Sequence, residues 1–94
     1  MPHDYDVIVA GAGMVGAAIG YGLVGQGRRV LMLDGADTDY RAAKANFGLV
    51  WVQGKGHGQP EYQRLSLSAV LAWPAFAEQL EADSGMALAY ERKG

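Results

Sequence analysis

The feature that most constrains this chain is a glycine-rich turn that lies between two apolar runs near the start of the sequence. "DYDVIVA" leads into Gly11, and "RRVLMLD" ends on Asp34. Short runs of β-branched and other apolar residues favour strands, and the stretch between them is long enough for a helix. We therefore predict a strand, a turn, a helix and a second, parallel strand over residues 5–10, 11–14, 15–26 and 29–33.

Three glycines in this turn have the spacing G-x-G-x-x-G, at Gly11, Gly13 and Gly16. The first permits a tight turn, the second leaves room for a pyrophosphate against the backbone, and the third lets helix and strand approach. The helix start offers free N–H groups and a positive dipole end to phosphates. Asp34, 23 residues after Gly11, ends the next strand, where a carboxylate accepts hydrogen bonds from ribose hydroxyls and disfavours NADP. The pattern predicts a dinucleotide site, and the alternative is a glycine-rich unit that binds nothing.

A second glycine-rich stretch, "ANFGLVWVQGKGHG" at residues 45–58, also follows an apolar run. Its glycines have the spacing G-x-G-x-G, and Gln59 and Glu61 occupy the positions where a further glycine would complete the fingerprint. The strand-ending acid is missing as well, because Glu78 falls inside a helical stretch. We therefore predict one dinucleotide site, with a flexible turn at 54–58 that leads away from it.

The composition argues against several other classes of function. The net charge of −2 gives no electrostatic case for binding nucleic acid or an anionic membrane. The absence of cysteine excludes disulfides, thiolate metal sites and a cysteine nucleophile. The two histidines, His3 and His57, lack converging ligands, so we expect no metal site. For His57, a solvated loop and a place near the cofactor both stay open, and the sequence leaves the catalytic residues unknown.

Residues 7–27 carry no charged side chain and are long enough to cross a bilayer. Gly16 and Gly20 even form the G-x-x-x-G pattern of packed membrane helices. Seven glycines in this stretch are a poor composition for one continuous helix, however, and "MPHDYD" is acidic where a secretory signal is basic. We therefore expect a cytoplasmic protein without a membrane span, and a membrane segment stays as an alternative.

Beyond residue 59 the pattern is helical. "PEYQRLSLSAVLAWPAFAEQLEADSG" predicts one or two helices over 60–84, with Pro60 at the start, Pro74 interrupting or kinking, and Gly85 at the end. At helical spacing, Trp73 and Phe76 are better explained by core packing than by contact with a cofactor. "MALAYERKG" predicts a return strand or the approach to one.

The stretch "DYDVIVAGAGMVGAAIGYGLVGQGRRVLMLD" resembles the N-terminus of FAD-dependent oxidoreductases of the D-amino-acid oxidase and glycine oxidase group. "AAKANFGLVW" is similar to the small-residue segment S/T-x-A-x-x-G by which this group enters an apolar strand beside the flavin. Gly48 stands at its glycine position, and Ala43 departs from it where a hydroxyl residue is common. "NFGLVWVQGKG" looks most like the FAD subunits of opine oxidases.

The resemblance implies an α/β fold: a Rossmann-like FAD/NAD(P)-binding βαβ unit with parallel strands, truncated before the substrate domain. Residues 1–94 would form the N-terminal part of an FAD-binding domain, with a βαβ core at 5–34, a flavin-side segment at 41–52 and a helical segment at 60–84. Lys44 would meet phosphate or a flavin carbonyl more readily than Lys55. Together with the fingerprint, the resemblance implies these cofactor-binding residues: Gly11, Ala12, Gly13, Met14, Val15, Gly16, Asp34, Ala43, Lys44, Asn46, Phe47, Gly48 and Leu49.

The function implied by the resemblance is the FAD-dependent oxidation of amino acids or secondary amines to imines, at CH–NH or CH–NH₂ groups. The implied partners are a small amino-acid or amine substrate and other subunits of an oxidoreductase complex. Residues 1–94 alone are expected to be inactive. An NAD-binding Rossmann fragment and a non-catalytic nucleotide-binding module are the alternatives.

Overall fold

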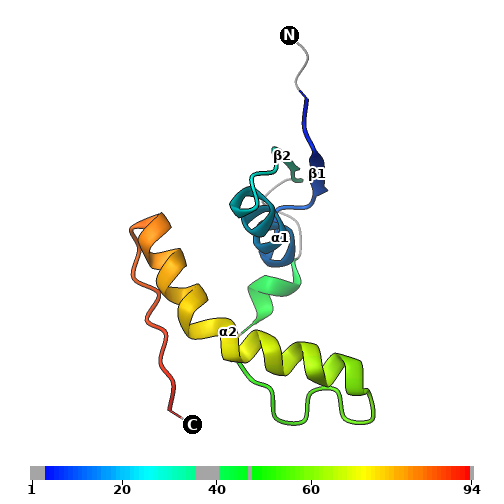
Figure 1. Cartoon of the computed structure of the whole chain (residues 1–94), viewed down its shortest axis with the longest axis vertical. Coiled ribbons are helices and arrows are strands. Elements are labelled where there is room, and N and C mark those ends of the chain that lie inside the picture. Colours follow the sequence, from blue (N-terminus) through cyan, green and yellow to red (C-terminus); the bar gives the residue numbers. More distant parts are fainter. Residues whose placement is uncertain (1–3, 36–40, 47, 94) are drawn as a thin grey trace. The chain divides into compact units, whose positions relative to one another are not determined.

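The computed structural model of the chain describes residues 4–35, 41–46 and 48–93. The chain divides into two compact units, Met1–Phe47 and Gly48–Gly94, and each is described by itself. In chain order the elements are β1 (Val7–Ala10), α1 (Met14–Gly25), β2 (Val30–Leu33), the 3-10 helix η1 (Ala42–Ala45) and α2 (Pro60–Ser84) (Figure 1).

The first unit is a strand–helix–strand unit with parallel strands. β1 pairs with β2 in parallel, with Val7 opposite Val30 and Ala10 opposite Leu33, and α1 forms the crossover. A carboxylate fixes the start of this pair, because the N–H of Arg29 donates to Oδ2 of Asp6 at 2.8 Å. The predicted α/β unit is confirmed, and each strand begins one or two residues later than the sequence suggests.

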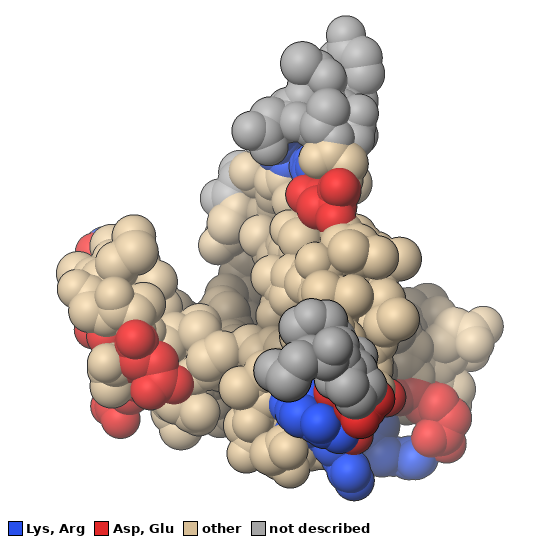
Figure 2. All heavy atoms as spheres, turned by 90° about the horizontal axis from the view of Figure 1, so that it is seen from above, with Lys and Arg blue, Asp and Glu red and all other residues tan. Residues whose placement is uncertain are grey.

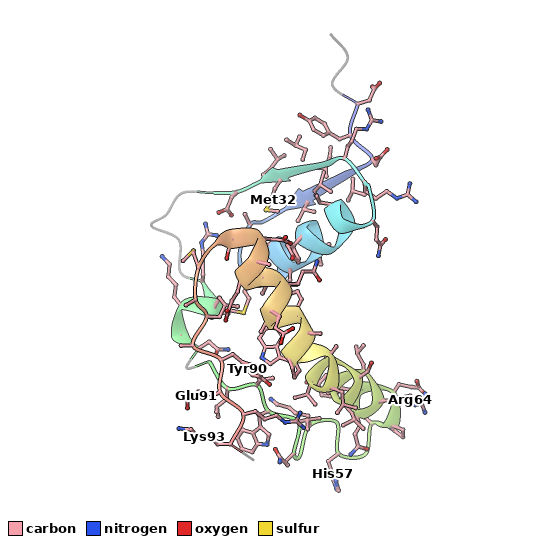
Figure 3. All side chains as sticks on the ribbon, turned by 60° about the vertical axis from the view of Figure 1, so that its left-hand side comes forward. Met32, His57, Arg64, Tyr90, Glu91 and Lys93 are labelled. Carbon is pink, nitrogen blue, oxygen red and sulfur yellow. The ribbon has the colours of Figure 1, made fainter. Side chains whose placement is uncertain are left out.

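One face of the sheet packs on α1 through glycine. A Cβ built on Gly20 would lie 2.6 Å from Cε of Met32, the β2 side chain labelled in Figure 3. Val9 is buried on this side, whereas Ile8 and Leu33 are 60% and 51% exposed. A continuous apolar run such as "DYDVIVA" predicts a strand that is buried on both faces. This prediction is wrong for β1, because the described part of the chain covers only one face of the two-stranded sheet.

The second unit is built around α2. Pro60 occupies the first turn, where its missing N–H costs no hydrogen bond, and Gly85 ends the helix in the left-handed conformation, with φ of 70°. The helix is single but bends near its middle (Figure 1). The bend follows from Pro74, which cannot donate to the carbonyl one turn earlier and whose ring crowds it.

The segment after α2 turns back beside the helix (Figure 1). The N–H of Leu88 donates to Oε1 of Glu81 at 3.2 Å, and the ring of Tyr90 meets Trp73 edge-on at 6.2 Å. Trp73 also stacks on Phe76 at 5.0 Å, as expected of packing residues. No return strand forms over 86–93, where a backbone N–H binds a helix side chain. The alternative, that this segment is the approach to a strand, stays a prediction.

The glycine-rich loop at 54–58 is folded onto the start of α2. Gly54, Gly56 and Gly58 all have positive φ, and a Cβ on Gly56 would lie 2.6 Å from the backbone nitrogen of Gln63. The carbonyl of Gly56 accepts the N–H of Gln59 at 2.7 Å. The predicted turn is present over residues 53–58, and its glycines serve a close approach to the helix. That the turn leads away from the dinucleotide site stays a prediction. Residues 48–52 also form no strand, contrary to expectation.

Candidate dinucleotide-binding site

The turn between β1 and α1 leaves backbone groups at the helix start uncapped. Gly11 has a φ of 103°, which only glycine adopts readily, and its N–H donates to the carbonyl of Leu33 at 2.6 Å. Gly13 is the residue before α1, and no side chain caps the helix there. The first N–H groups of a helix lack partners within it, so Met14, Val15 and Gly16 present donors and the positive dipole end to an anion.

Gly13 and Gly16 differ in what surrounds them. A Cβ on Gly13 would meet no atom within 4 Å. A Cβ on Gly16 would lie 1.8 Å from the carbonyl oxygen of Gly11 and 3.3 Å from Cγ1 of Val9. Gly16 is therefore required for the helix to sit on the turn, while the space beside Gly13 is open to a ligand.

Asp34 follows β2 and joins the turn. Its Oδ1 accepts the N–H of Ala12 at 3.1 Å, and its Oδ2 lies 2.8 Å from Nη1 of Arg41. The Arg41 guanidinium, and then the Ala12 N–H, hold the pKa of the Asp34 carboxyl below its ordinary value, so the group is ionised at neutral pH. The side chain is 33% exposed, and its carboxylate has more acceptor positions than its donors in the structure fill, so it suits ribose hydroxyls.

The other predicted site residues lie in two places. Ala43 and Lys44 are in η1, directly after Arg41, and Asn46 follows it. Gly48 and Leu49 belong to the second unit, where they line a groove with α2 and residues 88–93. Phe47 lies outside the described residues. Within the first unit, the structure thus gathers residues 11–16 and Asp34.

Arg41 is the residue that motif spacing missed. It is neither part of G-x-G-x-x-G nor of the small-residue segment that begins at Ala42. The sequence gives two weak signals: Arg41 is the first residue of the predicted flavin-side segment 41–52, and it is a basic residue seven positions after a strand-ending acid. No spacing rule connects such a pair.

Comparison with known proteins decides the family. Residues 6–94 match the profile of the family described as FAD dependent oxidoreductase. The chain belongs to this FAD-dependent oxidoreductase family. FAD is the family's cofactor, and the βαβ unit with its glycine turn is the corresponding Rossmann-like region.

Relatives within this family share the region. The chain is 45% identical over 92 residues to an opine oxidase subunit from Agrobacterium tumefaciens, covering 98% of this chain and 25% of that protein. It is 31% identical to glycine oxidase of Geobacillus kaustophilus, over 100% of this chain and 25% of that protein. It is 38% identical to N-methyl-L-tryptophan oxidase of Yersinia pestis, and this match covers 81% of this chain and 20% of that protein. The chain thus spans about a quarter of the length of the curated relatives it matches. No solved structure matches it significantly.

The residues present fit the ADP half of the family's cofactor. An anion has uncapped N–H donors at the start of α1 and open space beside Gly13, and a ribose has an ionised acceptor at Asp34. His57 is exposed in the 54–58 loop and points outward (Figure 3). Across residues 4–35, 41–46 and 48–93, no three metal-ligating side chains gather, and no helix is long and apolar enough to span a membrane.

Proposed function

We propose that this chain forms the part of an FAD site that holds the ADP half of the cofactor, in an oxidoreductase that acts on amino acids or secondary amines. The observation that carries the proposal is the uncapped turn at Gly13 beside the ionised carboxylate of Asp34, which reaches the turn from the neighbouring strand. These are the two chemical groups that a dinucleotide requires, donors for the pyrophosphate and an acceptor for the ribose.

Each residue of the turn has a separate task in this proposal. Gly11 turns the chain, Gly13 leaves the backbone accessible, and Gly16 lets α1 lie against the carbonyl of Gly11. Met14 and Val15 contribute backbone N–H groups, and the N–H of Ala12 holds Asp34 in place. FAD held by these residues would supply the hydride acceptor for oxidation at the substrate carbon that bears the nitrogen, and the imine formed would hydrolyse.

The remainder of the site is proposed from the family resemblance. Residues 5–34 would be the core of the FAD-binding domain, 41–52 would lie on the flavin side, and 60–84 would form a supporting helical segment. In that flavin-side segment we assign Ala43, Lys44, Asn46, Phe47, Gly48 and Leu49 to the cofactor.

The substrate class and the assembly are proposed from the names of the relatives. Those names include glycine oxidase, N-methyl-L-tryptophan oxidase and a subunit of opine oxidase. Oxidation at CH–NH or CH–NH₂ groups and association with a further subunit are therefore our proposals for this protein. A cytoplasmic location stays a prediction.

The test is the cofactor content of the whole gene product. We expect a yellow protein with an absorbance maximum near ~450 nm and FAD released on denaturation. A matched Asp34→Ala variant should lower the affinity for FAD by roughly ten- to hundredfold, the worth of a hydrogen bond to a charged group. A colourless protein that binds NAD, or no nucleotide, would contradict the proposal. Unchanged FAD affinity in the variant would remove Asp34 from the site.

A further inference from the structure

Arg41 differs from a surface arginine in how closely it is held. Its Nη1 lies 2.8 Å from Oδ2 of Asp34, and its side chain is 21% exposed. The comparable pair at the opposite end of the same strands joins Arg29 and Asp6 at 3.5 Å, and the side chain of Arg29 is 64% exposed. Exposed ion pairs of the second kind contribute little and are screened by salt. The tighter geometry of Arg41 therefore points to a role beyond surface charge.

Contacts on both oxygens fix the Asp34 carboxylate, and the backbone N–H of Gly35 also donates to it. Oδ1 accepts the N–H of Ala12 at 3.1 Å, and Oδ2 meets the guanidinium of Arg41. One contact alone would leave the carboxylate free to rotate, whereas two set its plane. A carboxylate has roughly four acceptor positions, so these three donors do not exhaust it. Because Ala12 is part of the glycine turn, the acceptor positions that stay open lie beside that turn.

We propose that Arg41 is a positioning residue of the nucleotide site, which orients the Asp34 carboxylate so that its remaining lone pairs accept the hydroxyls of the adenosine ribose. This inference rests on the proposed function and adds to it the residue that sets recognition of the ribose. Arginine suits the task because its planar, permanently charged group keeps a fixed orientation against a carboxylate.

The experiment measures recognition of the ribose separately from overall affinity. The whole gene product is prepared without flavin, and ADP and 2′,3′-dideoxy-ADP are each titrated by calorimetry. We expect the wild-type protein to prefer ADP by about tenfold or more, and Arg41→Ala to reduce that preference to about threefold or less. Arg41→Lys should keep an intermediate preference, because an ammonium still pairs with the carboxylate but without the planar geometry. A merely structural role would weaken both ligands alike and leave their ratio unchanged.

Two further variants test whether Arg41 changes the preference for ADP through the Asp34 carboxylate. In an Asp34→Ala background, adding Arg41→Ala should leave the preference where Asp34→Ala alone puts it, because Arg41 acts through that carboxylate. Arg29→Ala is the matched control, since it breaks the Asp6 pair on the same two strands and should keep the wild-type preference.

The outcomes separate this inference from the proposed function. A wild-type preference retained in Arg41→Ala, in a protein that still binds FAD, would overturn the positioning role and leave the proposed function standing. A wild-type protein that takes up neither FAD nor ADP would overturn both.

Discussion

At the scale of single residues, Gly13 and Gly16 allow a matched test of the turn. We expect the same substitution to lower the stability of the fold at Gly16 and the affinity for the cofactor at Gly13. Gly16→Ala places a methyl group where the carbonyl oxygen of Gly11 stands 1.8 Å away, and should destabilise the protein by about 1–3 kcal/mol or more. Gly13→Ala meets no protein atom within 4 Å, and should leave the unfolding free energy within about 0.5 kcal/mol.

Substitution of Gly13 should change the affinity for FAD although it barely changes the stability of the fold. Gly13→Ala should weaken FAD binding in a well-folded protein, and Gly13→Val should weaken it further, because the side chain occupies the space proposed for the pyrophosphate. Chemical denaturation and FAD titration of the same variants give the two readings. Full FAD affinity in Gly13→Val would disprove the fingerprint as a phosphate site.

Acid sensitivity is the second prediction at this scale. The pKa of Asp34 is lowered chiefly by Arg41, and that of Asp6 chiefly by the backbone N–H of Arg29, from the ordinary value of 3.8. A carboxyl whose pKa is lower in the folded protein than in the unfolded chain stabilises the folded protein at pH values above its unfolded-state pKa. This stabilisation is lost as the pH falls through the folded-state pKa. Between about pH 6 and pH 2.5, the thermal unfolding temperature should therefore fall less steeply in the double variant Asp6→Asn, Asp34→Asn than in the wild type. Equal slopes would show that neither pair contributes.

At the scale of elements, two glycines should respond to alanine with opposite signs. Gly85 ends α2 with φ of 70°, where a Cβ is strained, so Gly85→Ala should lower the unfolding free energy by about 1 kcal/mol. Gly22 lies within α1 with nothing within 4 Å of a built Cβ, so Gly22→Ala should raise it by about 0.5–1 kcal/mol. Urea unfolding of both variants checks the signs, and Gly85→Asn should recover part of the loss because asparagine tolerates this conformation.

At the scale of the whole molecule, the balance of buried and exposed apolar surface is unusual. Among described hydrophobic residues only Val9 and Ala77 are buried, while Ile8, Trp51 and Leu71 are 60%, 53% and 61% exposed. Uncharged residues cover most of the described surface seen in Figure 2. A two-stranded sheet with an open apolar face is marginally stable and available for association.

Residues 1–94 produced alone should therefore bind a hydrophobic dye and self-associate. Ile8→Thr, on the sheet face away from α1, should reduce both effects while keeping a residue that favours strands. Dye fluorescence and sedimentation measure them. A monomer that binds no dye would contradict this expectation.

Much of the local structure could be predicted from short-range rules. The glycine spacing, the apolar runs and Asp34 place a βαβ unit and its turn, and Pro60 and Gly85 mark the ends of α2, because backbone conformation at such residues depends on their own geometry. Whether residues 86–93 form a strand could not be predicted in this way, because a strand needs a partner strand that its own sequence does not specify, and in the structure this segment binds α2 instead.

Contacts between distant residues were decided by the path of the chain in space. Spacing proposed Asp34 as an acceptor, but only the fold shows that Ala12 and Arg41 hold its two oxygens. Likewise, the pattern of the second glycine loop predicts a turn, and only the fold shows Gly56 against the first turn of α2. The conformation of one residue is encoded locally, whereas the partner of a charge or the neighbour of a glycine depends on where the rest of the chain passes.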